Sequence, residues 1–185
     1  MANDNQAIKL LILDDSQNNA ERMVSLLRNA GHATRAHRVT SIEDLQECLQ
    51  QNWDICLAQT ETSYMTAEDA ITLIKRQSRD IPFILLKPEI DLEMRTEALR
   101  SGMTDAVPHD ADVLLTLIVD RELANLNARR QRRIVEQTLR EAEKRCQLLL
   151  DSSVDAIAYV HDGMHIYTNR AYGELFGYED PDDLA

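Results

Sequence analysis

The sequence has few of the features that build membrane spans or disulfide frameworks. It contains no run of about 18 apolar residues, and residues 1–7 are polar and acidic, so neither a membrane-spanning helix nor a signal peptide is expected. Its three cysteines, Cys48, Cys56 and Cys146, are widely spaced and lack partners at metal-ligand intervals. They predict reduced thiols rather than disulfides or a zinc site. We therefore expect a cytoplasmic chain without membrane insertion.

Clustered basic charge is also scarce. The net charge is −12, and residues 1–111 carry 11 basic and 18 acidic side chains, residues 112–150 carry 8 and 6, and residues 151–185 carry 1 and 8. An acidic body disfavours nucleic acid as a partner, because binding phosphates requires clustered lysine and arginine. The one such cluster is either the solvated side of an exposed helix or a docking surface for an acidic partner, and it comprises Arg129, Arg130, Arg132 and Arg133.

Glycine and proline are absent from Val113 to Leu150, a stretch rich in strong helix formers. It predicts one long helix, which at 1.5 Å per residue would reach roughly 55 Å, more than a small domain needs to cover one of its faces. We therefore expect a helical connector at residues 112–150, between a first domain at residues 1–111 and part of a second domain at residues 151–185.

Short apolar segments alternate with amphipathic segments in the first domain. The apolar segments predict strands at Ile8–Leu13, Ala33–Val39, Trp53–Ala58, Ile81–Leu86 and Asp105–Val107. The segments between them predict helices, three of which have suitable N-caps in Ser16, Ser41 and Thr66. The alternation predicts an α/β fold with a five-stranded, parallel, doubly wound sheet, whose fifth helix continues as the connector.

Right-handed crossovers place the carboxyl end of every strand at one edge of such a sheet. The polar residues that the strands deliver to this edge are the candidate site, namely Asp14, Asp15, Gln59, Lys87 and His109. Five βα units with an acidic pair after the first strand resemble the receiver domain of two-component response regulators. That resemblance implies a Mg²⁺-binding acidic pair, a phosphoacceptor aspartate, a threonine or serine, and a lysine followed by proline.

Only the acidic pair, Asp14 and Asp15, matches this pattern. Gln59 stands at the phosphoacceptor position, and a neutral amide cannot form an acyl phosphate. Lys87 replaces the hydroxyl residue, and His109 with Asp110 replaces the Lys-Pro pair. The resemblance therefore implies a degenerate, non-phosphorylatable pseudo-receiver that is not an enzyme, with no catalytic residue, no resident metal and no cofactor. The alternative is a true switch, gated by phosphorylation or by a metal at the acidic pair.

Three further alternatives concern these residues. Lys87 with Pro88 could itself be the Lys-Pro pair, but this alignment would leave the strand at residues 105–107 without a place. Asp54 is a second candidate for the phosphoacceptor, but it lies five residues before Gln59. That is roughly 16 Å along a strand, so Asp54 cannot join the acidic pair. The ammonium group of Lys87 either reaches Asp14 or Asp15 in place of a metal, or points into solvent. We expect His109 to be a surface residue rather than a general base.

The second half of the long helix has apolar residues at spacings of four, three, four and three. They predict a coiled-coil seam of about two heptads, formed by Val135, Leu139, Ala142, Cys146 and Leu149. The alternative is that this segment packs on the second domain of its own chain. Near the first domain, Val113–Val119 is apolar nearly all round, which suggests a second surface buried against a partner. We favour a parallel homodimer in which mild oxidation cross-links Cys146.

Residues 148–178 predict two short antiparallel strands joined through Asp162 and Gly163, then a helix that begins near Asn169. The segment resembles the start of a PAS domain. A receiver-like domain, a helical connector and a PAS start together resemble receiver–PAS–GGDEF–EAL regulators of type IV pili that respond to cyclic di-GMP. This resemblance implies a dimerising module with protein partners at the cell pole or in the pilus machinery, and a role in twitching motility.

Overall fold

The computed structural model describes residues 7–77 and 79–177. Contacts within the chain divide it into two compact units, Met1–Arg129 and Arg130–Ala185. The first unit is an α/β domain that includes the beginning of a long helix. The second unit contains the remainder of that helix, a β-hairpin and a short helix.

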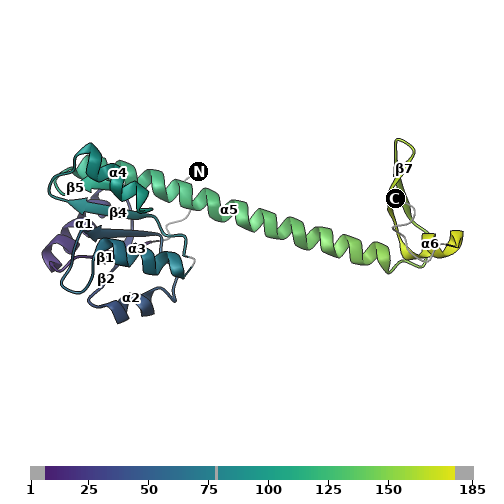
Figure 1. Ribbon diagram of the computed structural model, residues 1–185, viewed down its shortest axis with the longest axis horizontal. Coiled ribbons are helices and arrows are strands. Elements are labelled where there is room, and N and C mark those ends of the chain that lie inside the picture. The colour runs from purple at the N-terminus through teal and green to yellow at the C-terminus, as the bar shows by residue number, and fades with distance from the viewer. Residues whose placement is uncertain (1–6, 78, 178–185) are drawn as a thin grey trace. The chain divides into compact units, whose positions relative to one another are not determined.

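A parallel sheet with the strand order β2-β1-β3-β4-β5 forms the centre of the first unit (Figure 1). Its strands are β1 (Ile8–Leu13), β2 (Thr34–Arg38), β3 (Ile55–Gln59), β4 (Phe83–Lys87) and β5 (Asp105–Pro108). The predicted doubly wound α/β fold is confirmed. β4 begins one residue after Pro82, which has no N–H to give to a ladder but whose carbonyl accepts from the Cys56 N–H at 2.8 Å.

Four helices connect these strands: α1 (Gln17–Asn29), α2 (Ile42–Cys48), α3 (Ala67–Arg76) and α4 (Leu92–Arg100). The predicted N-caps are confirmed, because the side chains of Ser16, Ser41 and Thr66 each accept a hydrogen bond from the backbone three residues further on. Gly31 follows α1 with φ of +95°, a conformation that favours glycine.

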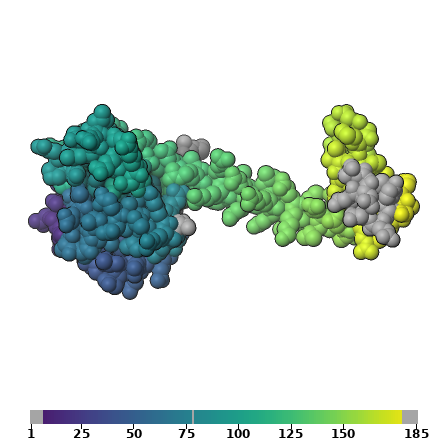
Figure 2. Space-filling view, in the orientation of Figure 1, coloured from purple at the N-terminus to yellow at the C-terminus, as the bar shows by residue number. Residues whose placement is uncertain are grey.

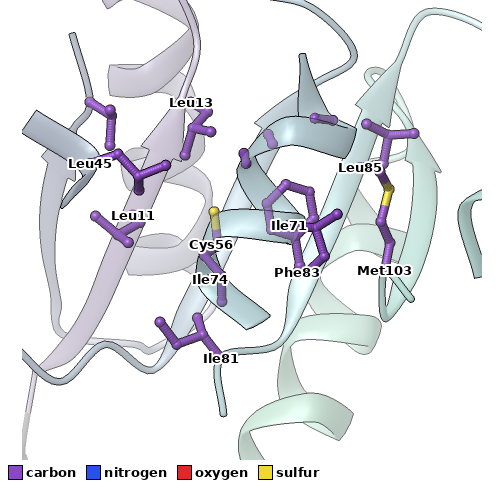
Figure 3. Packing of buried hydrophobic residues seen from close by; sticks show 14 of the residues in the cluster. Leu11, Leu13, Leu45, Cys56, Ile71, Ile74, Ile81, Phe83, Leu85 and Met103 are labelled. Carbon is purple, nitrogen blue, oxygen red and sulfur yellow. The ribbon is translucent and has the colours of Figure 1, made fainter. Parts of the chain in front are cut away.

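Two apolar layers cover the two faces of the sheet. One layer packs α1 and the first turns of α5 against side chains such as Ile12 and Ile84. The other packs α2, α3 and α4 against side chains such as Leu11 and Phe83, and Figure 3 shows Phe83 beside Ile71 in it. Because both faces are covered, the strands are continuous apolar runs, and polar residues appear where the strands end.

The helix α5 (Asp112–Asp151) is 40 residues long, so the predicted long helix is confirmed. Its first turns bury Leu115, Ile118 and Val119 against the sheet. On the outward side, Val113 is 76% exposed and Leu117 is 60% exposed. The segment Val113–Val119 therefore has one buried and one exposed apolar face.

The second unit contains the predicted antiparallel hairpin of β6 (Ala158–His161) and β7 (Met164–Thr168), followed by α6 (Arg170–Phe176). Asn169 caps α6 and is fully buried. Its side-chain oxygen accepts from the N–H groups of Ile157 and Tyr172, while its amide nitrogen donates to the carbonyl groups of Leu150 and Asp155. Tyr178 and the rest of the predicted PAS segment lie outside the described residues. Among the described helices, none has the length and apolar character needed to cross a bilayer.

Candidate functional site

The carboxyl ends of β1 and β3 bring Asp14 and Gln59 together. The two strands pair in parallel, with Leu13 opposite Ala58. Asp14 directly follows Leu13, and Gln59 directly follows Ala58 as the last residue of β3, so both residues lie at the same edge of the sheet. Asp14 is 3% exposed. Its Oδ1 accepts a hydrogen bond of 2.7 Å from the backbone N–H of Ser16, and its Oδ2 accepts one of 2.8 Å from Nε2 of Gln59. Both carboxylate oxygens are therefore satisfied by neutral donors.

The second acid, Asp15, is exposed and binds the loop after β3. Its Oδ2 accepts from the backbone N–H of Ser63 at 2.7 Å, and its Oδ1 accepts from the Ser63 hydroxyl at 2.9 Å. The loop carries a further turn in which Thr62 and Met65 exchange backbone and hydroxyl hydrogen bonds. Neutral donors thus hold both acids, which fixes the loop after β3 to the loop after β1.

Lys87 ends β4 at the same edge, and its carbonyl accepts from the N–H of His109 at 2.8 Å. Within the described ranges, its ammonium group forms no ion pair or hydrogen bond with Asp14 or Asp15. The hypothesis that Lys87 neutralises the acidic pair is therefore wrong for this structure. The physical reason is that β3 lies between β1 and β4, so the amide of Gln59 occupies the position beside Asp14.

His109 follows β5 and is half-buried, so the prediction of a surface residue is only partly correct. Its Nε2 is buried and has no hydrogen-bond partner among the residues that the structure describes. Its carbonyl accepts from the guanidinium of Arg22, which also pairs with Asp112 at 2.7 Å. Arg22 therefore connects α1 to the loop after β5 and to the first residue of α5.

Asp54 lies at the opposite end of the sheet, as predicted. It immediately precedes β3, and its Oδ2 accepts from the backbone N–H of Lys9 near the start of β1 at 2.8 Å. The structure therefore joins Gln59 to Asp14 and Ser63 to Asp15 by hydrogen bonds, with Lys87 and His109 paired through their backbones along the same edge.

A charged group that sequence reasoning missed joins α4, β5 and α5. Asp105 is 3% exposed, and its carboxylate accepts from Arg95 at 2.8 Å and from Arg121 at 3.0 Å. Burial opposes ionisation of Asp105, but hydrogen bonds from Arg95, the Ala106 N–H and Arg121 outweigh it and lower the pKa of this carboxyl. An acid at the start of a buried strand is a usable signal, because a buried carboxylate requires hydrogen-bond donors or a cation nearby.

No family model matches the chain. The chain is 27% identical over 189 residues to the phosphoglycerate transport system transcriptional regulatory protein PgtA of Salmonella typhimurium, and the match covers 94% of this chain. The chain spans only 45% of the length of that curated relative.

Solved receiver domains have a similar fold. The signal receiver domain of a signal transduction histidine kinase from Syntrophus aciditrophicus is 25% identical with a TM-score of 0.55, covering 64% of this chain and 92% of that domain. The receiver domain of a Francisella response regulator is 18% identical with a TM-score of 0.56, covering 64% of this chain and 98% of that domain. With the strand order, these similarities show that the first unit has the fold of receiver domains.

Proposed function

We propose that the first unit is a pseudo-receiver that does not accept a phosphoryl group and serves as a protein-contact module. The observation that carries this proposal is the hydrogen bond from Gln59 to Asp14. An acyl phosphate forms on a carboxylate, which Gln59 lacks. The same hydrogen bond occupies an oxygen of Asp14 that a Mg²⁺ ion would otherwise bind.

The domain boundaries that we propose are a pseudo-receiver at residues 1–111, a signalling connector at residues 112–150, and the N-terminal part of a PAS domain at residues 151–185. Exposure along the connector supports a role in dimerisation. Val135, Leu139 and Leu149 are 63%, 57% and 67% exposed, and Ala142 and Cys146 are exposed as well. In Figure 2, the side chains of the green part of α5 are exposed on the visible face.

The occupant that we infer for this seam is a second copy of the chain. A stripe at alternating spacings of four and three packs against an identical parallel stripe, because each apolar residue then inserts between residues of its counterpart. The exposed apolar side of Val113–Val119 supports a second contact between copies. The described residues thus offer two apolar surfaces on one helix for a homodimer.

The wider role that we propose rests on resemblance. The connector sequence and the PAS-like start resemble those of FimX, a multidomain regulator of type IV pili in which degenerate GGDEF and EAL domains follow and the EAL domain binds cyclic di-GMP. We propose that this chain is the cytoplasmic N-terminal region of such a regulator, and that it helps to place the regulator at the cell pole for pilus assembly and twitching motility.

Sedimentation equilibrium with and without acetyl phosphate and Mg²⁺ tests the proposed function. We expect a dimer of unchanged mass in both conditions, because association depends on apolar contacts and not on phosphorylation. A monomer in both conditions contradicts the dimer. A change of association on adding the phosphodonor would instead support the rival switch.

For polar placement, the test is a fluorescent fusion of the whole regulator with and without residues 1–111. We expect loss of the polar focus and of twitching when these residues are removed. Unchanged placement would contradict the localisation role and would leave the chemistry of Gln59 unaffected.

A further inference from the structure

Three potential metal ligands converge between the end of β2 and α2, and none of them belongs to the acidic pair. The ligand atoms of His37, Asp44 and Cys48 all lie within 4.8 Å of one another. Nε2 of His37 is 2.9 Å from Oδ1 of Asp44, and Sγ of Cys48 is 3.6 Å from the same oxygen. One nitrogen, one oxygen and one sulfur atom therefore surround a common point.

We propose that His37, Asp44 and Cys48 form a binding site for Zn²⁺. This site is separate from the proposed pseudo-receiver function. An imidazole, a carboxylate and a thiolate are the ligand types that Zn²⁺ prefers, at bond lengths of about 2.0–2.3 Å. In a tetrahedral site such bonds separate the ligand atoms by roughly 3.3–3.7 Å. The two separations from Asp44, 2.9 and 3.6 Å, are close to this range, and the separation between His37 and Cys48 is within 4.8 Å.

Neighbouring groups already orient the carboxylate. Oδ2 of Asp44 accepts from the N–H and the hydroxyl of Thr40, at 2.9 and 3.2 Å. These bonds leave Oδ1 directed at the other two ligands. Contacts of this kind fix the orientation of metal-binding carboxylates and raise metal affinity.

Helix geometry and exposure also suit a metal. Asp44 and Cys48 are four residues apart on α2, so their side chains lie on the same side of the helix. The Cys48 residue is 8% exposed, whereas the His37 side chain is 43% exposed, so the group opens to solvent on one side. With three protein ligands, the open side leaves a fourth position for water.

Binding of Zn²⁺ releases one proton to solvent, from the thiol of Cys48. Nε2 of the neutral His37 ring binds the metal without a proton, because the ring then carries its proton on Nδ1. Burial, with a contribution from Asp44, raises the pKa of this thiol to about 11, so it is protonated in the metal-free protein at neutral pH. The Asp44 carboxylate and the resulting Cys48 thiolate then balance the charge of Zn²⁺.

A bound metal would tie α2 to β2 next to the acidic pair. Arg38 follows His37 and donates a hydrogen bond of 3.2 Å to the carbonyl of Asp14. Trp53, the single tryptophan of the chain, has its ring centre 6.1 Å from that of His37. The fluorescence of Trp53 therefore reports on the proposed site directly.

Calorimetric titration of the untagged, reduced chain with Zn²⁺ tests the proposal, and titration with Co²⁺ while Trp53 fluorescence is recorded provides a second readout. We expect saturation at one equivalent and quenching by Co²⁺. His37→Ala and Cys48→Ala should each weaken binding at least tenfold. Mg²⁺ should not compete, because it prefers sites built only from oxygen ligands.

Two matched controls are His161→Ala and Cys146→Ser, which remove an exposed histidine and an exposed cysteine elsewhere. Both should bind Zn²⁺ as the parent chain does. Circular dichroism establishes whether the variants fold. If Cys48→Ala does not fold, His37→Ala still tests the proposal, because the His37 side chain is 43% exposed and its removal disturbs the core less. Absence of saturable binding, or equal affinity in His37→Ala, would overturn the proposal.

Discussion

Nε2 of Gln59 donates a hydrogen bond of 2.8 Å to Oδ2 of Asp14 at the carboxyl edge of the sheet. This contact places a neutral donor where the receiver resemblance requires an anionic acceptor of phosphoryl groups. It also gives one carboxylate oxygen of the buried Asp14 a neutral donor, while the guanidinium of Arg38 donates to the backbone carbonyl of the same residue. Donors of the protein itself therefore satisfy both carboxylate oxygens of Asp14.

Replacing Gln59 with aspartate should open the pocket to Mg²⁺. The variant loses the amide donor and places a third carboxylate beside Asp14 and Asp15, and repulsion among the three favours a hard divalent cation. We expect Gln59→Asp to bind Mg²⁺ at least tenfold more tightly than the parent chain in a titration of amide NMR spectra. The exposed Gln51→Asp adds the same charge elsewhere and should leave the affinity unchanged. Equal Mg²⁺ affinity in all three proteins would argue against this account of the pocket.

Asp105 should make stability depend on pH. Its pKa is lowered in the folded state from an ordinary value of 3.8, so its contribution is present above that value and is lost as the pH falls through the lower, folded-state pKa. We expect Asp105→Asn to reduce the free energy of unfolding by about 1–3 kcal/mol at pH 7. Urea unfolding at pH 7 and at pH 3 should show a smaller difference at the lower pH.

The exposed Asp110→Asn serves as the control, because it removes the same charge two residues after the end of β5, at a position that forms no ion pair with Arg95 or Arg121 among the described residues. Its free energy of unfolding should stay near that of the parent chain at both pH values. A penalty for Asp105→Asn that stayed constant from pH 7 to pH 3 would mean that its ion pairs are not the cause.

A charged residue in the coiled-coil seam should dissociate the proposed dimer. In Leu139→Asp, two carboxylates would face each other in an apolar contact and lose their hydration. We expect the dissociation constant from sedimentation to rise at least tenfold. Gln137→Asp places the same charge on the opposite side of α5, where it should have little effect. Similar dissociation by both variants would point to general charge repulsion rather than a seam.

Mild oxidation should distinguish a parallel from an antiparallel pair. In a parallel seam in register, the two copies of Cys146 lie side by side, whereas Cys48 and Cys56 are buried in the first unit. We expect a covalent dimer on a non-reducing gel, absent in Cys146→Ser. Failure to cross-link under conditions in which sedimentation shows a dimer would exclude the parallel register.

The sheet could be predicted from the sequence because strands covered on both faces are continuous apolar runs, as in Ile8–Leu13 and Phe83–Lys87. The polar edge followed from the parallel topology. The partner of each edge residue did not follow, because Gln59 rather than Lys87 reaches Asp14 through the order of the strands in the sheet, which residue spacing does not encode. The contact between Asp15 and Ser63 depends on the path of a loop, for which the sequence gives no periodic signal.

Two other clusters of side chains could not be predicted from the sequence for a similar reason. His37, Asp44 and Cys48 have no familiar ligand spacing, and they converge only because the turn after β2 folds α2 back beside that strand. Arg95 and Arg121 meet Asp105 from two different helices, a relation that requires the packing of α4 and α5 around β5. Local patterns therefore predict elements and edges, whereas contacts between elements require the three-dimensional structure.

The intact mass of the chain after incubation with acetyl phosphate and Mg²⁺ tests the central claim most directly. A receiver domain that retains an aspartate at the end of its third strand, treated in parallel, establishes that the phosphodonor is active. Because Gln59 offers an amide in place of that aspartate, we predict that the mass of this chain does not change. A gain of one phosphoryl group would contradict the account.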